Sequence, residues 1–203
     1  ASNNFGKEIW QFGDDRKLKI KSKIEFNSPR LSELKGVHVF RGVTTGYNPA
    51  FIINENIKKD LIKSNSSSKE IIKPLLQGRN IKRWVYEMSK EYLLFVPWHF
   101  PFHNELSIIG ASKKAEAEFK KQFPCIYQHL SGFKDQLQDR NIDETGKRYE
   151  WYALQRCAAS YYPEFDKEKI IWGLTADKWA FAYDNKRHYL PSNGYILTSE
   201  GEF

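Results

Sequence analysis

Residues 41–51 combine a fixed positive charge with two glycines and several short polar side chains. The segment reads Arg41-Gly42-Val43-Thr44-Thr45-Gly46-Tyr47-Asn48-Pro49-Ala50-Phe51. Arginine supplies the charge, threonine, tyrosine and asparagine supply hydrogen bonds, and glycine lets a backbone approach a partner closely. These properties predict a loop that binds a polar, anionic partner. Its expected contact residues are Arg41, Thr44, Thr45, Tyr47 and Asn48.

Two further segments, residues 79–84 and 147–152, mix cations with aromatic rings. Arginine pairs bidentately with phosphate or with the edge of guanine, and aromatic rings stack on bases. We therefore predict phosphate contacts for Arg79, Lys82 and Arg83. Contacts at or near the bases are predicted for Arg148, Tyr149 and Trp151, and also for Lys178 in a third candidate loop, residues 174–179. An alternative stays open for both segments, in which they are solvated turns whose aromatic rings pack into the core.

Patterns for catalysis are weak. The residues Asn48-Pro49-Ala50-Phe51 are similar to the (Asn/Asp)-Pro-Pro-(Tyr/Phe) loop of amino-group DNA methyltransferases, but the second proline is missing. No Gly-rich strand-to-helix turn for a methyl donor precedes them. The carboxylates of Glu164, Asp166 and Glu168 beside Lys169 could serve a nuclease, yet solvation of a charged turn explains them as well. We predict that this chain contains no catalytic residue.

A metal site is equally weakly supported. His99 and His103 have a spacing seen in zinc sites, but Phe100-Pro101-Phe102 forbids a regular helix between them. The two cysteines, Cys125 and Cys157, lie far from any paired motif. We predict no metal and no cofactor in this chain.

The charge of the chain is unevenly distributed. Its 203 residues include 32 Lys and Arg against 25 Asp and Glu, a formal net charge of +7. Residues 1–90 hold 18 of these basic residues and 9 of the acidic ones, whereas residues 91–203 hold 14 and 16. A basic half joined to a slightly acidic half indicates one electropositive face. With an aromatic content of 15%, this favours nucleic acid as the partner.

The elements that must position these segments indicate an α+β fold, with mixed, mostly antiparallel small sheets and packed helices. Residues 1–25 are predicted to form an edge strand or a connector, because lysines alternate with apolar residues. A domain over residues 26–203 follows. Its expected helices are 54–64, 69–76, 113–123 and 125–138, with Asn54 and Ser112 as the expected N-caps of the first and third. Its expected strands are 84–87, 91–96, 169–173, 179–183 and 195–198.

Compartment and completeness follow from simple features. Two cysteines are too few for a secreted disulfide framework, and the chain has no 18-residue apolar run and no signal sequence. We expect a cytoplasmic protein that binds no membrane. The start without methionine and the abrupt end indicate a piece of a longer protein.

Motifs in a fixed order cover about residues 37–198. They are Gly42-Val43-x-Thr45-Gly46-x-Asn48-x-Ala50-Phe51, Ile72-Lys73-Pro74-x-x-x-Gly78-Arg79-Asn80-Ile81-Lys82-Arg83-Trp84, Tyr92-Leu93-Leu94, Phe123-Pro124-x-Ile126-Tyr127-x-x-Leu130, Leu137-x-x-Arg140, Trp151-Tyr152-x-Leu154 and Lys169-Ile170-Ile171-Trp172. In this order and spacing the chain resembles the TaqI-like C-terminal specificity domain. That family comprises target recognition domains of adenine-N6 DNA methyltransferases and type IIG restriction-modification enzymes.

The resemblance implies a DNA-methylase specificity-domain fold that recognises a sequence in double-stranded DNA, chiefly through the major groove. A separate methyltransferase domain of the same bacterial parent would bind S-adenosylmethionine and flip the adenine. Mg²⁺ is expected in a further domain of the parent, outside this chain, if the parent also cuts DNA. The alternatives left open are an RNA-binding module with Tyr47, Trp84 and Trp151 stacking on bases, a protein-interaction module that uses residues 98–102, and a small hydrolase.

Overall fold

The computed structural model of the chain describes residues 14–156, 161–175 and 178–201. By its internal contacts the chain divides into two units, Ala1–His38 with Ser199–Phe203, and Val39–Thr198. This division lies further along the chain than the predicted boundary at residue 25. All of the predicted contact residues belong to the second unit. No helix within the described ranges is long and apolar enough to cross a membrane.

Two small sheets form the framework. The first has the strand order β1 (Val37–Arg41), β7 (Gly194–Ser199), β5 (Lys169–Gly173) and β6 (Phe181–Asp184). The second has the order β2 (Ile52–Asn54), β4 (Glu91–Leu94) and β3 (Ile72–Leu75). Antiparallel pairing joins β5 to β6 and β7, and β4 to β2 and β3. The predicted α+β class with small, mostly antiparallel sheets is confirmed.

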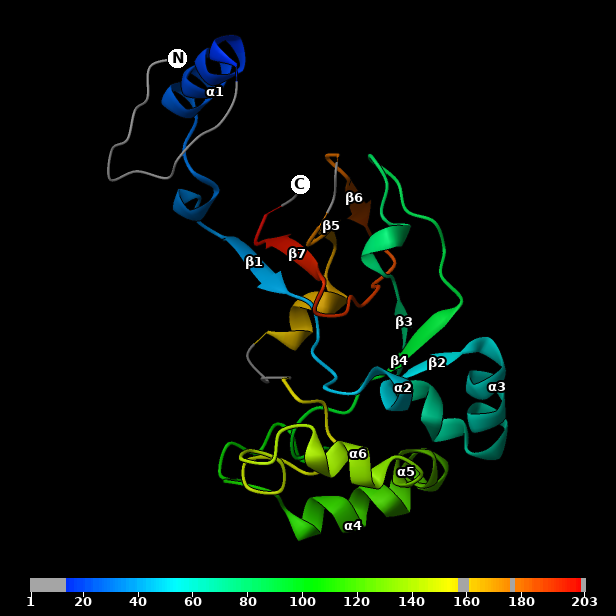
Figure 1. Cartoon of the computed structure of the whole chain (residues 1–203). Coiled ribbons are helices and arrows are strands. Elements are labelled where there is room, and N and C mark those ends of the chain that lie inside the picture. Colours follow the sequence, from blue (N-terminus) through cyan, green and yellow to red (C-terminus); the bar gives the residue numbers. More distant parts are fainter. Residues whose placement is uncertain (1–13, 157–160, 176–177, 202–203) are drawn as a thin grey trace. The chain divides into compact units, whose positions relative to one another are not determined.

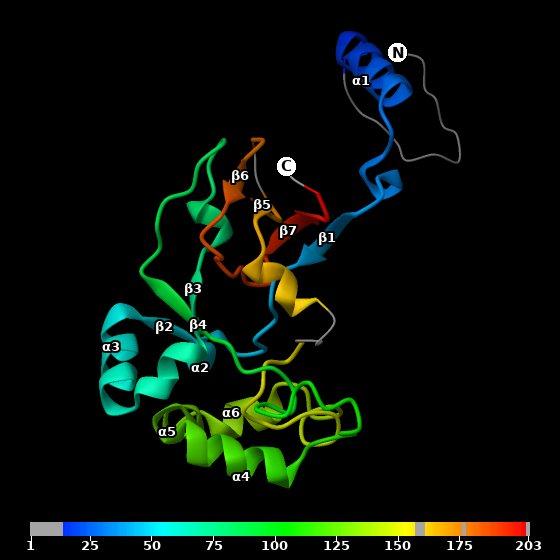
Figure 2. The ribbon, with the colours of Figure 1, turned by 180° about the vertical axis from the view of Figure 1, so that it is seen from behind.

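The helices begin where capping residues were expected. Helix α3 (Glu55–Ser64) follows Asn54, whose Oδ1 accepts the Ile57 N–H at 3.0 Å, and α4 (Lys113–Gln122) follows Ser112, whose Oγ accepts the Ala115 N–H at 3.2 Å. The short helices α2 (Asn48–Phe51), α5 (Pro124–Ser131) and α6 (Lys134–Asp139) complete the second unit. Figures 1 and 2 show α4, α5 and α6 grouped at the end of this unit opposite β6.

Of the two alternatives predicted for residues 1–25, the edge strand is wrong for the part that the structure describes, which starts at residue 14. Residues Asp15–Asn27 form helix α1, which Asp14 caps by accepting the Lys17 N–H at 2.9 Å. None of the residues of α1 is buried. Alternation of lysine with apolar residues identifies a strand only when one face is buried. Here neither face is, so capping and helix propensity decide the structure.

Three other predicted elements differ in the structure. Residues 69–76 do not form a helix, because Ile72–Leu75 pairs with β4 as β3 after a 3₁₀ turn at Ser66–Glu70. Residues 84–87 belong to a hairpin rather than a strand. The helix expected over 125–138 divides into α5 and α6 at Gly132. The helix over 113–123 and the three late strands are confirmed to within two residues at each end.

Aromatic rings dominate the core of the second unit. Phe119 stacks on Tyr152 with ring centroids 4.6 Å apart, and Phe165 stacks on Tyr189 at 4.9 Å. These four side chains are buried. Burying one large apolar side chain contributes about 1.5–3 kcal/mol before entropy is counted. The core therefore absorbs many of the rings that the sequence offered as stacking groups.

Candidate nucleic-acid interface

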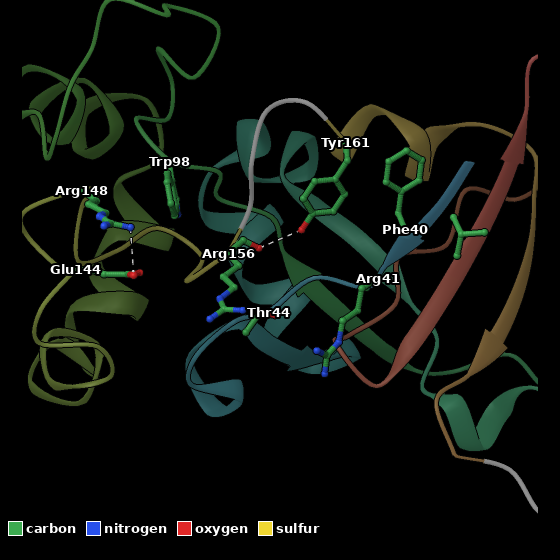
Figure 3. A pocket seen from close by; sticks show the side chains of 10 residues that line it. Phe40, Arg41, Thr44, Trp98, Glu144, Arg148, Arg156 and Tyr161 are labelled. Atoms are coloured by element: carbon green, nitrogen blue, oxygen red, sulfur yellow. Dashed lines mark hydrogen bonds and ion pairs between the residues drawn. The ribbon is translucent and has the colours of Figure 1, made fainter. Parts of the chain in front are cut away.

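An open pocket of about 630 Å³ lies where several segments of the second unit meet. The end of β1 and the following loop supply one part of its lining, and the segments around residues 98, 144–148, 156 and 161 supply the rest (Figure 3). The lining residues are Val39, Phe40, Arg41, Gly42, Thr44, Trp98, Glu144, Arg148, Arg156 and Tyr161. Three arginines and a single glutamate give this arginine pocket an excess of positive charge.

The loop after β1 is held in place by its own chain. The Gly42 N–H donates to the Gly194 carbonyl and the Val43 N–H to the Leu190 carbonyl, both at 2.8 Å. A Cβ atom at Gly42 would lie 2.0 Å from the Pro191 carbonyl oxygen. Glycine is therefore required here for close packing against residues 190–194. The rigid loop fixes Arg41 and Thr44 at the edge of the pocket.

A partly buried arginine, Arg140, fixes the other half of this loop. The Arg140 guanidinium donates to the carbonyl of Thr45 at 2.5 Å, to that of Trp151 at 2.9 Å and to that of Ala153. Gly46, with φ of 76°, leaves room for the Arg140 side chain, because a Cβ there would lie 2.7 Å from its Cδ atom. Burial lowers the pKa of Arg140 to about 10. The group thus stays charged at neutral pH and joins two segments that line the pocket.

The three arginines of the pocket are exposed but positioned differently. The Arg41 Nε donates to the Ser192 carbonyl at 2.7 Å, which orients its guanidinium. Arg148 pairs with Glu144 at 3.3 Å, and Figure 3 shows it turned toward that carboxylate. Arg156 is anchored through its backbone, because its N–H donates to the Thr44 carbonyl at 3.1 Å. Such groups suit an anion that bears several oxygens, since guanidinium binds phosphate bidentately.

Comparison with known proteins identifies the family. Residues 73–202 match the family described as the TaqI-like C-terminal specificity domain. The chain belongs to this family. The predicted class, a DNA target recognition domain of restriction-modification and methyltransferase proteins, is confirmed by this match. The specificity-domain match includes Trp98, Glu144, Arg148, Arg156 and Tyr161 of the arginine pocket.

Two individual proteins show similarity to this specificity domain. The type II methyltransferase M.MjaIV of Methanocaldococcus jannaschii is 32% identical over 114 residues, which are 56% of this chain and 33% of the methyltransferase. This chain therefore corresponds to about a third of that relative. The type IIL restriction-modification enzyme MmeI, solved in complex with DNA, aligns with 83% of this chain and 20% of its own, at 11% identity and a TM-score of 0.47.

Three of the predicted contact residues lie at the arginine pocket: Arg41, Thr44 and Arg148. Arg156 was not among the predicted contact residues, although it lines the pocket together with Arg41 and Arg148. Its signal was weak, because it is a single cation just after the Trp151-Tyr152-x-Leu154 motif. Only the bridge between Arg156 and Thr44 in the fold reveals that these distant positions are neighbours.

Three other predicted residues are buried, which corrects their assignment as contact residues. Thr45 is 4% exposed, Tyr149 is 0% exposed and Trp151 is 7% exposed. The Tyr149 ring stacks on Trp98 with centroids 4.9 Å apart, and the Trp151 Nε1 donates to Glu116 at 2.7 Å. Their rings are engaged in the core, so the alternative of core aromatics holds for this segment.

Two residues of the loop lie at the start of α2, Tyr47 as its N-cap residue and Asn48 as its first residue. Tyr47 is half-buried, and its ring lies 6.0 Å from that of Phe133. Asn48 is exposed and accepts the Thr45 hydroxyl proton at 2.6 Å. Because the Asn48 Oδ1 accepts this bond, the amide nitrogen is the more accessible of the two hydrogen-bonding groups in the Asn48 side chain.

The remaining predicted residues, Arg79, Lys82, Arg83 and Lys178, are exposed but do not line the arginine pocket. Arg79 pairs with Glu91 at 3.3 Å, and the Lys82 Nζ donates to the Arg79 carbonyl at 2.9 Å. The Arg83 guanidinium lies 5.5 Å from the centre of the Trp84 ring. Lys82 and Arg83 belong to a hairpin closed by the bridge between Ile81 and Tyr86, and Arg79 precedes it in a 3₁₀ turn, so these three cations form a second basic region.

The residues considered for catalysis have structural roles. Lys169 is fully buried and pairs with Asp184 at 2.7 Å, so it is not available beside Glu164 or Asp166 for phosphodiester chemistry. The His99 Nδ1 lies 3.1 Å from the Glu150 carboxylate, and His103 stacks on Phe100. Across the described ranges, no group of three or more His, Cys, Asp or Glu could hold a metal ion. Cys157 lies outside the described residues.

Proposed function

We propose that this chain holds double-stranded DNA and reads its target sequence for the methyltransferase part of a longer protein. Adenine N6 would be the modified position, and this chain would be non-catalytic by itself. The observation that carries the proposal is the arginine pocket, which lies in a chain of the specificity-domain family and carries three exposed guanidinium groups around one opening.

The side chains of the pocket divide into two groups by their chemistry. Arg41 and Arg156 are assigned to phosphates, because rigid backbone contacts hold them and no particular base is needed to engage them. Thr44 and Arg148 of the pocket are assigned to base edges, together with Asn48, which lies outside the pocket in the same loop as Thr44. Hydroxyl, guanidinium and amide groups distinguish the donors and acceptors of the major groove. Phosphate contacts set affinity and register, whereas base contacts set specificity.

S-Adenosylmethionine is assigned to another part of the parent protein, because the residues of this chain do not fit it. Gly42 and Gly46 pack against Pro191 and Arg140 of the same chain, so neither glycine leaves its backbone open to a cofactor. Asn48 and Pro49 form the first turn of α2 rather than an active-site loop. Mg²⁺, where the parent also cuts DNA, is assigned to its absent endonuclease. The methyltransferase part is the expected intramolecular partner.

The phosphate assignment is tested with the double variant Arg41→Ala, Arg156→Ala. The affinity for a labelled duplex is measured by fluorescence anisotropy over a series of salt concentrations. Each lost phosphate contact reduces the slope of log K against log salt by about 0.9, so we expect a reduction of about 1.8. The control is Lys59→Ala, Lys121→Ala, which removes the same charge from exposed helix positions. Its slope should match the native one.

Equal slopes for the two double variants would remove Arg41 and Arg156 from the phosphate-binding set. Displacement of the duplex by an equal amount of single-stranded RNA would instead favour the RNA-binding alternative. The recognised sequence and the methylated atom are established by mapping methylation in a host genome with and without the parent gene. Absence of N6-methyladenine at a defined sequence in that map would contradict the adenine assignment.

A further inference from the structure

Residues 81–86 form a tight hairpin that the arginine pocket does not include. Ile81 and Tyr86 make an antiparallel bridge, and the Lys82 N–H donates to the Val85 carbonyl at 2.8 Å. Arg83 and Trp84 are therefore the two residues of the turn. Trp84 has φ of 71°, in the left-handed region where turns favour glycine or asparagine. A bulky aromatic residue at such a position is strained.

The strained turn is fixed to the rest of the unit. The Trp84 N–H donates to the Phe181 carbonyl of β6 at 2.7 Å. Trp179 packs against the same residue, with its ring 5.6 Å from the Phe181 ring. The side chains of Trp84 and Trp179 are 65% and 79% exposed. Two indole rings are therefore exposed to solvent near Phe181, and their exposure means that they contribute little to the stability of the fold.

The chemistry around Trp84 fits a nucleic acid. Residues 79–91 hold the basic residues Arg79, Lys82, Arg83 and Lys90 against the acidic residues Glu87 and Glu91. The Arg83 guanidinium lies beside the indole, 5.5 Å from its centre. An exposed flat ring with cations next to it complements a base with its flanking phosphates. A purely apolar partner surface would offer no counter-charge to Lys82 and Arg83.

We propose that this hairpin is a second DNA contact, in which Trp84 stacks on a base at an opened base step while Lys82 and Arg83 bind the neighbouring phosphates. The inference rests on the proposed function and adds to it a local distortion of the DNA. Insertion of an apolar side chain costs unstacking energy, which the added contacts offset. That cost is lowest where a base is already unpaired.

The test compares a fully paired duplex with the same duplex carrying an unpaired bulge. We expect the native chain to bind the bulged duplex more tightly. Trp84→Gly should weaken binding to the bulged duplex by about 5-fold to 150-fold, the range of one base–aromatic stack, and should abolish the preference. Trp84→Phe should retain the preference. Glycine suits the turn, so Trp84→Gly should unfold at the same temperature as the native chain or higher.

The matched control is Phe26→Ala, which removes another exposed aromatic ring and should leave both affinities unchanged. Trp84→Asn, which tolerates the same φ, provides a second folded variant. If Trp84→Gly and Trp84→Asn both keep the native preference while the variants of Arg41 and Arg156 weaken binding, the hairpin contact is overturned and the proposed function stands. If the native chain binds neither duplex, both proposals are overturned.

Discussion

The interior cations of this domain and the cations of the arginine pocket have opposite roles. Lys169 is fully buried and Arg140 is partly buried, and fixed oxygens of the fold accept hydrogen bonds from both. Arg41, Arg148 and Arg156 direct similar charges to an open pocket. Both Arg140 and Arg156 contact the same loop, but in different ways. The Arg140 guanidinium donates to the Thr45 carbonyl, whereas only the backbone N–H of Arg156 donates to the Thr44 carbonyl, which leaves the Arg156 guanidinium exposed.

The difference shows that partners within the fold decide what a cation does. A buried charge requires several hydrogen bonds, because its desolvation costs several kcal/mol. An exposed guanidinium retains its hydration until an anion displaces the water. Removal of an interior cation or its partner should therefore affect stability, whereas removal of a pocket cation should affect binding.

The largest effect on stability is expected for Asp184→Asn. The Asp184 carboxylate pairs with the Lys169 ammonium at 2.7 Å and accepts the His188 N–H at 2.8 Å, with both acid and lysine fully buried. The amide would leave a buried ammonium without its counter-charge. We expect a loss of about 3–5 kcal/mol in the free energy of unfolding, measured by urea denaturation at neutral pH.

The same pair predicts an acid dependence of stability. Burial alone would raise the pKa of Asp184, but the hydrogen bond from His188 and the charge of Lys169 hold it well below its ordinary value of 3.8. A carboxyl group with a depressed pKa in the folded state stabilises the protein above its unfolded pKa, and this contribution is lost as the pH falls below about 4. Asp184→Asn should flatten this acid limb. Glu118→Gln, which alters an exposed pair with Lys121, should leave the limb unchanged.

A somewhat smaller loss is expected for Arg140→Ala. The substitution removes the donors to the Thr45, Trp151 and Ala153 carbonyls. Leaving one buried acceptor unsatisfied costs about 1–3 kcal/mol, and partial entry of water reduces the sum, so we expect a loss of about 3 kcal/mol. Thermal and urea unfolding would measure it. Arg140→Lys should recover only part of the loss, because lysine lacks the planar fork. Full recovery would show that charge alone matters at this position.

Sequence patterns predicted the parts of the fold that short-range chemistry determines. Asn54 and Ser112 cap α3 and α4 as expected, because an N-cap needs only a side-chain oxygen three residues before its donor. The strand β5 was predicted at its observed bounds from a run of apolar residues. The helix predicted for residues 69–76 was wrong, because pairing of Ile72–Leu75 with β4 overrides the local helical preference.

The candidate site was only partly predictable for a related reason. Arg41 and Arg148 lie in polar segments, which indicates exposure. No local pattern predicts that the Arg140 side chain is partly buried and bound to carbonyls whereas the Arg156 side chain is exposed. Tyr149 and Trp151 occur next to a cation, as a base-stacking group would, but they pack in the core. Burial depends on contacts between distant segments, such as the stack of Trp98 on Tyr149. A single sequence does not encode these contacts locally.

The smallest effect on stability is expected for Arg148→Ala. Its side chain is exposed and pairs with Glu144 at 3.3 Å, an arrangement that contributes about 0–1 kcal/mol. Urea unfolding should therefore show a change below about 1 kcal/mol.

If Arg148 contacts a base edge as assigned, the same variant should lose about 1–3 kcal/mol of discrimination between the target duplex and one altered at the contacted base pair. Arg148→Lys separates charge from geometry, because lysine keeps the charge without the bidentate fork. An Arg148→Ala variant that weakens binding to both duplexes equally and keeps native discrimination would assign Arg148 to a phosphate instead, since phosphate contacts carry no sequence information.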